Sequence, residues 1–344
     1  MIKQTIFSTA LAAGLMLAAD AQAKEKWVFN SFVGPKHLVN YPLKKEWVPD
    51  VMAATKGEVE ITFLPTSAAP PPKQIDGVAS GQFDGAWIFH GFTAKRAIGT
   101  RLGILPFLAS GKGEALSVAY WRTYQKFFAD KKEYDDDGIQ ILSLFQFTGG
   151  NFYSGTDKPI LSIADMKARK MWVLAGTPSQ TLKGVGVKHV SGPAARVSQF
   201  TQTNVVQGLA GFPREGIVAF GALEFTKSTT VTSGASIMIP SFALFVSKKK
   251  WDALSPALQK AVMSVSGEKV ARAVGKRADI HEVKAHKTMN KKGIVDHTAS
   301  KAFENELRAA GKPVVKAWLQ QVKKLGVDGN EAIEFYRRQV SATN

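Results

Sequence analysis

Residues 236–262 read SIMIPSFALFVSKKKWDALSPALQKAV, and this stretch decides how the two halves of the chain are joined. The apolar part before the lysines has the composition of one or two buried strands. Ser255 and Pro256 then supply a helix N-cap and a first helical residue, and the helical pattern runs on to Gly293. We therefore predict strands that return to the first half of the chain, followed by a helix long enough to brace both halves.

Strands alternate with helices in each half of the chain before this stretch. The strand-like segments of the first half are residues 26–32, 58–65, 83–89 and 139–147. Helical patterns lie between them, which is typical of an α/β unit with a parallel sheet. A glycine-rich break at residues 148–155 reads as the first crossing into a second α/β unit. The strands of that second unit are expected at residues 170–174 and 188–190.

The N-terminus has the features of a secretory signal peptide. Lys3 precedes an apolar run at residues 6–19, and Ala21-Gln22-Ala23 forms a small-x-small cleavage pattern. The run is shorter than the about 20 residues of a membrane-spanning helix, and no later stretch is long and apolar enough to span a bilayer. We predict cleavage after Ala23 and a periplasmic mature protein.

The net charge of +17 admits three classes of partner: nucleic acid, an anionic membrane surface or acidic small molecules. Export disfavours nucleic acid, and the lysine pairs and triples lack the interleaved aromatic residues of a nucleic-acid surface. The chain contains no cysteine, which excludes disulfides and thiolate chemistry.

No catalytic or metal-binding constellation is visible in the sequence. Nucleophile elbows, phosphate loops and dinucleotide fingerprints are absent. His281 and His286 are five residues apart and cannot share a metal as an i,i+4 pair does. The three consecutive aspartates at 135–137 lack the alternate spacing of a calcium loop. We expect a binding protein without a cofactor, with its ligand in a cleft between two lobes; an exported enzyme is a remote alternative.

Six motifs, in the right order, resemble one protein family: the periplasmic solute-binding subunits of tripartite ATP-independent periplasmic (TRAP) transporters, of the dicarboxylate-binding type. The motifs are KWVFNSF (26–32), ASGQFDGAW (79–87), LGILPFL (102–108), KPILSIADMKARKMW (158–172), TNVVQG (203–208) and LFVSKKKWDALSPALQKAV (244–262). Together they cover nearly the whole mature chain.

The resemblance implies an α/β, two-lobed periplasmic-binding-protein (clamshell) fold with crossing strands and a long C-terminal bracing helix. Residues 24–149 with about 237–278 would form lobe I, and residues 150–236 with about 279–344 would form lobe II. The resemblance also implies that the lobes close on a small solute, by family an organic acid, and that the closed form delivers it to the large and small membrane subunits of a TRAP permease. We expect a monomer.

The expected binding site departs from the family pattern at several positions. Trp172 stands where the family carries its carboxylate-binding arginine, and Phe152 stands where many members carry a second arginine. Gln207 replaces an acidic residue of the family, Gly211 stands where many members have asparagine, and Arg196 stands where many have glutamate. The resemblance thus places flat rings where the family has cationic anchors.

These departures leave the ligand class open. Trp172 is expected to form the floor of a pocket, and Phe32, Phe89 and His90 end strands that point at the cleft in the family. A carboxylate could still be held by Arg196, by His90 or by a backbone amide. Alternatively, rings in place of the arginine clamp would suit an amine-bearing or neutral aromatic solute.

Overall fold

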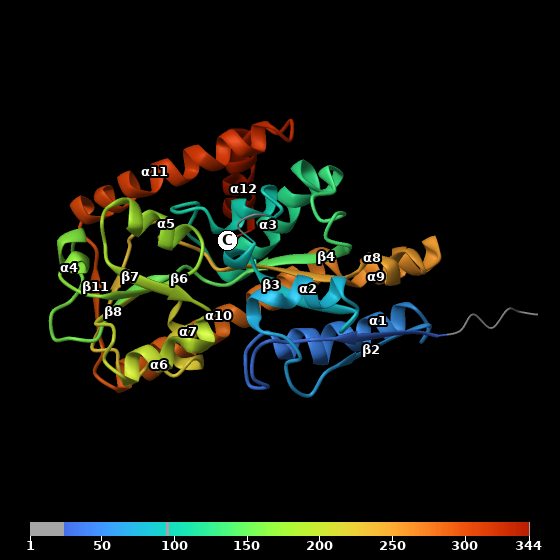
Figure 1. Ribbon diagram of the computed structural model, residues 1–344, viewed down its shortest axis with the longest axis horizontal. Coiled ribbons are helices and arrows are strands. Elements are labelled where there is room, and N and C mark those ends of the chain that lie inside the picture. Colours follow the sequence, from blue (N-terminus) through green and yellow to red (C-terminus); the bar gives the residue numbers. More distant parts are fainter. Residues whose placement is uncertain (1–23, 94–95, 344) are drawn as a thin grey trace, which may run out of the picture.

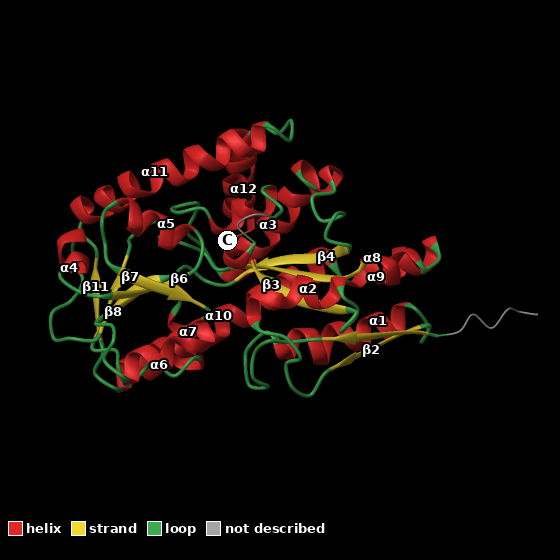
Figure 2. Cartoon of the chain, viewed as in Figure 1, coloured by secondary structure: helices red, strands yellow, loops and turns green. Residues whose placement is uncertain are grey.

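The computed structural model describes residues 24–93 and 96–343, so the predicted signal peptide lies outside the described residues. The described chain forms two β-sheets, each covered by helices, that lie side by side along the long axis of the molecule (Figures 1 and 2). The α/β two-lobed fold predicted from the sequence is confirmed. No helix in the described part of the chain combines the length and the apolar character that crossing a membrane requires.

The first sheet has five strands in the order β2-β1-β3-β10-β4. They are β1 (Glu25–Phe29), β2 (Val59–Phe63), β3 (Gly85–Phe89), β4 (Ile139–Gln146) and β10 (Ser241–Ser247). The strands β1, β2 and β3 are parallel, as the strand–helix alternation predicts. The strand β10 enters between β3 and β4 and runs antiparallel to both, because the chain returns from the second lobe to reach it.

The second sheet has six strands in the order β11-β9-β5-β8-β6-β7. They are β5 (Asn151–Ser154), β6 (Met171–Leu174), β7 (His189–Gly192), β8 (Gly208–Phe212), β9 (Ser228–Val231) and β11 (Val295–Thr298). Residues 148–155 are predicted to form a break, whereas residues 151–154 form β5. The strand β5 has only the four residues Asn-Phe-Tyr-Ser, which is too short for the apolar alternation that reveals a strand in a sequence.

Helices cover both faces of the two sheets (Figure 2). They are α1 (Val48–Ala54), α2 (Gln74–Ala79), α3 (Gly113–Phe127), α4 (Ile163–Lys167), α5 (Thr177–Gly184), α6 (Val197–Gln202), α7 (Arg214–Ala219), α8 (Lys248–Asp252), α9 (Pro256–Val265), α10 (Gly267–Lys291), α11 (Lys301–Lys323) and α12 (Gly329–Thr343). A π-helical segment, Pro42–Trp47, precedes α1 directly.

The predicted long helix is present but is divided into α9 and α10. Ser255 caps α9 as expected, since its side chain accepts a hydrogen bond from the backbone N–H of Leu258. The break falls at Gly267, whose φ of +47° is a left-handed conformation that favours glycine. A Cβ there would lie 2.9 Å from the ring of Trp121. The helix α10 then passes from the first sheet, where it packs on α3, to the second, where it packs on α7.

The C-terminal helix α12 returns to the first sheet. It packs along α3, and the hydroxyl of Tyr336 donates a hydrogen bond of 2.7 Å to Oε1 of Gln146 at the end of β4. Arg122 on α3 donates to Gln339 on α12 at 3.0 Å. The expected division gave all of residues 279–344 to the second lobe, and these contacts assign residues 329–343 to the first lobe instead.

We predict that Gly275→Ala destabilises the protein. A Cβ on Gly275 would overlap the carbonyl oxygen of Gly113, at the point where α10 crosses the start of α3. The crossing cannot easily open, because Asp279 on α10 accepts hydrogen bonds from the backbone N–H groups of Gly113 (2.6 Å) and Glu114 (3.1 Å). Overpacking costs about 1–3 kcal/mol, more than the about 1 kcal/mol that alanine gains over glycine in a helix. Urea unfolding would measure the difference.

The matched control is Gly184→Ala on α5. Gly184 is exposed and a Cβ there meets nothing within 4 Å, so the unfolding free energy should stay the same or rise slightly. If the two variants had equal free energies of unfolding, the α3–α10 crossing would accommodate a methyl group without steric strain.

Candidate functional site

A cavity lies between the two sheets and is lined by residues from both lobes. The first lobe contributes Phe32, Val33, His37, Pro71, Trp87, Phe89, Phe92, Phe147, Pro240 and Phe242. The second lobe contributes Leu174, Pro193, Ala194, Ala195, Phe212, Pro213, Glu215, Gly216 and Phe220. The cavity volume is about 50 Å³, measured as the space open to the centre of a water molecule. One water needs about 10–15 Å³ by that measure, so the space holds about three to five water molecules with the lobes in this arrangement.

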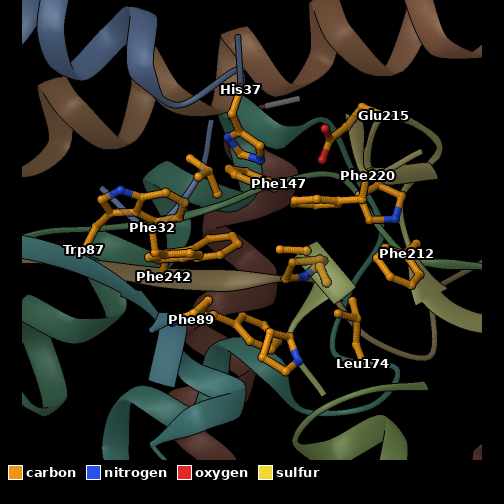
Figure 3. A pocket seen from close by; sticks show the side chains of 18 of the residues that line it. Phe32, His37, Trp87, Phe89, Phe147, Leu174, Phe212, Glu215, Phe220 and Phe242 are labelled. Atoms are coloured by element: carbon orange, nitrogen blue, oxygen red, sulfur yellow. The ribbon is translucent and has the colours of Figure 1, made fainter. Parts of the chain in front are cut away.

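Aromatic rings form a large part of the cavity wall. The rings of Phe147 and Phe242 lie 4.4 Å apart between centroids, and those of Phe32 and Trp87 lie 4.1 Å apart. Trp87 also meets Phe242 edge-on at 5.4 Å. Figure 3 shows Trp87, Phe32 and Phe242 together on one side of the cavity and Phe212 and Phe220 on the other. Two of these pairs are tilted and one is edge-to-face, so the rings of this part of the wall pack directly against one another.

Strand register places these rings at the cavity. Trp87 and Phe89 are two residues apart on β3, so both side chains leave the same face of the sheet. Phe242 is the second residue of β10 and pairs with Phe89 across the antiparallel ladder. The three rings therefore stand side by side at the sheet end that faces the second lobe. The indole of Trp87 is held in place by donating a hydrogen bond of 3.2 Å to Oγ of Ser31.

The second lobe closes the cavity with the ends of two of its strands and the loops that follow. Leu174 is the last residue of β6 and Phe212 is the last residue of β8. The chain then enters α7 through Pro213, which places Glu215 and Gly216 at the cavity. In parallel sheets the carboxyl ends of the strands are the usual place for ligands.

Two titratable side chains line the cavity, and in the view of Figure 3 they lie at one end of it. Burial lowers the pKa of His37 to about 3, with a further contribution from His281. Burial also raises the pKa of Glu215 to about 8, with a further contribution from the carboxylate of Glu282. At pH 7 the His37 ring is neutral and Glu215 is mostly protonated. Of the described residues that line the cavity, none is lysine or arginine.

Glu215 sits in a charged network behind the cavity wall. Its backbone N–H donates a hydrogen bond of 3.0 Å to Oε2 of Glu282 on α10. Arg214 pairs with Glu282 at 3.2 Å and with Asp296 on β11 at 2.7 Å. The imidazole of His286 also pairs with Asp296, at 2.9 Å. The cation nearest in sequence to Glu215 is therefore already engaged by other carboxylates.

The structure places two of the expected site residues in the cavity lining, Phe32 and Phe89. Phe32 lies in the loop after β1 and stacks on Trp87, and Phe89 ends β3. Their contact with a ligand stays a prediction.

Trp172 does not line the cavity, which corrects the expectation that its indole forms the pocket floor. It is fully buried on β6 and stacks on Phe212 with ring centroids 4.9 Å apart. Trp172 and Leu174 share one face of β6, but Trp172 lies two residues before the strand end. It therefore supports Phe212 from behind, and Phe212 is the ring that reaches the cavity.

Phe152 and His90 also lie away from the lining. Phe152 is fully buried on the other face of the second sheet, where its ring lies 5.7 Å from that of Phe303 on α11. Nδ1 of His90 shares a hydrogen bond of 3.0 Å with Oγ of Ser241, in a buried layer behind the strand ends. Burial lowers the pKa of His90 to about 3, so its ring is neutral and offers no charge to a carboxylate.

Gly211 and Arg196 are outside the lining as well. Gly211 has a φ of +92°, a left-handed conformation that favours glycine, and a Cβ there would meet Leu174, Met238 and Pro178 at ordinary contact distances of 3.5–3.6 Å. Arg196 is exposed and donates to Gln199 on its own helical segment at 3.3 Å. The guanidinium of Arg196, which is predicted to reach the cleft, therefore lies on the surface.

Sequence reasoning missed most of the lining residues. Phe147 and Phe242 were read only as parts of apolar strands, although both lie at the sheet end that the crossing segments share. His37 and Glu215 follow the ends of β1 and β8. Ligand contacts are usual at the carboxyl ends of parallel strands, so this position in the sequence could have identified both residues as candidates. Within the described residues, no group of three or more His, Asp or Glu side chains could hold a metal ion.

The family model for bacterial extracellular solute-binding proteins, family 7, matches residues 29–321 of the chain. A curated relative from Comamonas testosteroni, named outer membrane transporter protein TsaT, is 33% identical over 341 residues, which is 99% of this chain and 98% of the relative. The chain therefore belongs to the family 7 extracellular solute-binding proteins, and it is a binding receptor rather than an enzyme.

Solved structures of TRAP periplasmic solute-binding proteins share the fold. One from Bordetella bronchiseptica, with bound (R)- and (S)-mandelate, has a TM-score of 0.85 and 25% identity and covers 93% of this chain and 99% of its own. One from a marine metagenome, in complex with 3-hydroxybenzoate, has a TM-score of 0.79 and 26% identity over the same shares. The resemblance to TRAP solute-binding proteins found in the sequence is confirmed.

We predict that Trp172→Ala lowers the stability of the fold by about 3–5 kcal/mol, since a buried tryptophan is replaced by a cavity. Trp172→Phe keeps a ring against Phe212 and should cost clearly less. Urea unfolding of both variants would measure this. If Trp172→Ala were as stable as the wild type but bound its solute tenfold more weakly, the indole would have to touch the ligand directly.

We predict that Glu215 makes stability fall as pH rises. The pKa of Glu215 is raised from 4.5 in the unfolded chain to about 8 in the fold. Its contribution to the free energy of unfolding is fully present below pH 4.5. That contribution is lost as the pH rises to 8, at about 1.4 kcal/mol for each pH unit. Glu215→Gln resembles the protonated acid and should lack this loss.

Thermal unfolding of wild type and Glu215→Gln between pH 5 and 9 tests this. The two should be similar at pH 5, and the variant should be the more stable at pH 9. If the unfolding temperatures of the two proteins changed in parallel between pH 5 and 9, the pKa of Glu215 would not be raised by its burial at the cavity wall.

Proposed function

We propose that this chain is an extracytoplasmic receptor that captures a small aromatic organic acid between its lobes and delivers it to the membrane subunits of a TRAP permease. The cavity wall of packed rings is the single observation that carries the proposal. A flat ring packed against the phenylalanine rings of this wall would bury apolar surface, and each favourable ring pair contributes about 0.5–1.5 kcal/mol beyond area burial.

The location of the cavity supports a receptor that closes on its ligand. Leu174, Phe212 and Glu215 belong to the second lobe, while Phe32, Trp87 and Phe242 belong to the first. A solute that touches both sets stabilises the closed arrangement over an open one by its additional contacts. The connecting segments pair with each other, since the N–H of Gly150 donates to the carbonyl of Met238 at 2.8 Å. They are the natural place for the hinge.

Similarity to aromatic-acid receptors supports the ligand class. The structures from Bordetella bronchiseptica and the marine metagenome hold mandelate and 3-hydroxybenzoate, and both ligands join one ring to one carboxylate. Their identity to this chain is 25% and 26% over most of its length. A periplasmic location through the predicted signal peptide is part of the same proposal.

A second candidate is an amine-bearing or neutral aromatic solute. The observation that favours it is the presence of an acidic residue, Glu215, in a ring-lined cavity without lysine or arginine in its described lining. Aromatic faces and a carboxylate are the groups that bind organic cations.

We predict that the mature protein binds benzoate, mandelate or 3-hydroxybenzoate and binds succinate at least tenfold more weakly. Calorimetry would measure these affinities beside benzylamine and benzyl alcohol, which separate the two candidates. Phe147→Ala should weaken binding of the ring acids tenfold or more, because it removes the ring that stacks on Phe242. The matched control is Phe335→Ala, because the ring of Phe335 packs on Phe127 outside the cavity lining. This variant should leave the affinity for the ring acids unchanged.

A preference for succinate over every ring compound would refute the proposal, as would an unchanged affinity in Phe147→Ala. Tighter binding of benzylamine than of the acids would select the second candidate.

A further inference from the structure

We propose that Glu215 recognises the anionic head of the bound ring acid as a neutral hydrogen-bond donor, in place of the cation that such a head usually pairs with. This inference rests on the proposed function and names the group that completes the site. It assigns a specificity-determining residue, and with it a ligand that must accept a hydrogen bond at the end of the cavity occupied by Glu215.

Geometry selects Glu215 for this role. It is the one acidic side chain in the described lining, and its side chain is 4% exposed. In the view of Figure 3 its carboxyl group lies at the same end of the cavity as His37, whereas Phe89 and Leu174 lie at the other end. A ring seated among the phenylalanines would point its polar head at this end. The other polar side chain there, His37, accepts a weak hydrogen bond of 3.4 Å from the N–H of Val39 through Nδ1.

The groups around Glu215 keep its proton in place. On the α10 side stands Glu282, which accepts the backbone N–H of Glu215. Arg214, on the same helix as Glu215, is held by Glu282 and Asp296, and His286 is held by Asp296. His37 faces the cavity in neutral form, and His281 lies on α10 beyond it. Burial next to a second carboxylate raises the pKa of Glu215, and no cation among these groups is free to lower it.

The protonation state decides which ligand fits. An ionised Glu215 would repel a carboxylate in a cavity of low polarity, whereas a protonated one donates an O–H···O⁻ hydrogen bond, which is among the stronger types. An amine would need the ionised form, which burial and Glu282 both disfavour. With Glu215 protonated, the cavity is therefore unfavourable for a cation and complementary to an anion that accepts a hydrogen bond.

Binding is then linked to one proton. Above pH 8, where the free protein has lost the proton of Glu215, each bound anion takes up one proton from solution. The affinity for the anion falls tenfold for each further pH unit, and below pH 7 it is flat. In Glu215→Gln the amide N–H₂ group donates in place of the O–H group, so binding persists without any proton uptake.

The test is calorimetry of the mature protein with benzoate, mandelate and 3-hydroxybenzoate from pH 6 to 10, in buffers of different ionisation enthalpy. We expect wild type to lose about tenfold in affinity between pH 8.5 and 9.5, with one proton taken up per ligand at the higher pH. Glu215→Gln should have a flat profile, and Glu215→Ala should bind at least tenfold more weakly at pH 7. Glu224→Gln, a change at an exposed acid of the same lobe, should keep the wild-type profile.

Three outcomes overturn the inference. A flat wild-type profile, or an equal pH dependence in Glu215→Gln, would mean that another group contacts the anion. Proton release, with benzylamine bound more tightly than the acids, would mean that the carboxylate recognises a cation. In each of these cases a ring compound still binds, so the receptor proposal survives. Failure of every ring compound to bind would overturn both proposals together.

Discussion

The antiparallel entry of β10 between β3 and β4 is the constraint on which the rest of the structure depends. It requires the chain to leave the first lobe after β4, build the second sheet and come back, so two segments cross between the lobes. The same pairing sets Phe242 opposite Phe89 in the ladder. The cavity wall is thus a direct consequence of register, because a slip of one residue on β10 would turn Phe242 to the other face of the sheet.

The bracing helix α10 contacts both lobes. The helix α10 packs on α3 of the first lobe through Gly275 and on α7 of the second through Glu282. The segment that opens α7 also carries Glu215 into the cavity. A movement of the second lobe about the crossing segments would therefore change the surroundings of Glu215 and the contact with α10 together. Under the proposed role of Glu215, the short helix α7 couples the contact with the ligand to the position of the second lobe and to the protonation of Glu215.

The part of the fold that follows from local chemistry could be predicted from the sequence. The N-cap at Ser255, the parallel β1–β2–β3 unit and the two lobes all rest on caps, periodicity and motif order. The break at Gly267 could not, because it depends on how closely Trp121 approaches from α3. The site was only partly predictable for the same reason. Trp172 was placed on the correct strand and face, yet the two residues to the strand end decide whether a side chain reaches the cavity, and only the tertiary structure sets that distance.

The loss of cations from the cavity and the neutrality of Glu215 are a single electrostatic condition. A guanidinium among these rings would pair with Glu215 and keep it ionised. It would then be less available to pair with the ligand. With aromatic residues lining the wall, Glu215 keeps its proton and the cavity carries no net charge. Since the described lining of the cavity has no lysine or arginine, the basic residues lie outside it, and the net charge of +17 attracts anions within about 10 Å at 0.1 M salt. Under the proposed role of Glu215, long-range attraction of the anion comes from the outer surface, and its recognition comes from a cavity without net charge.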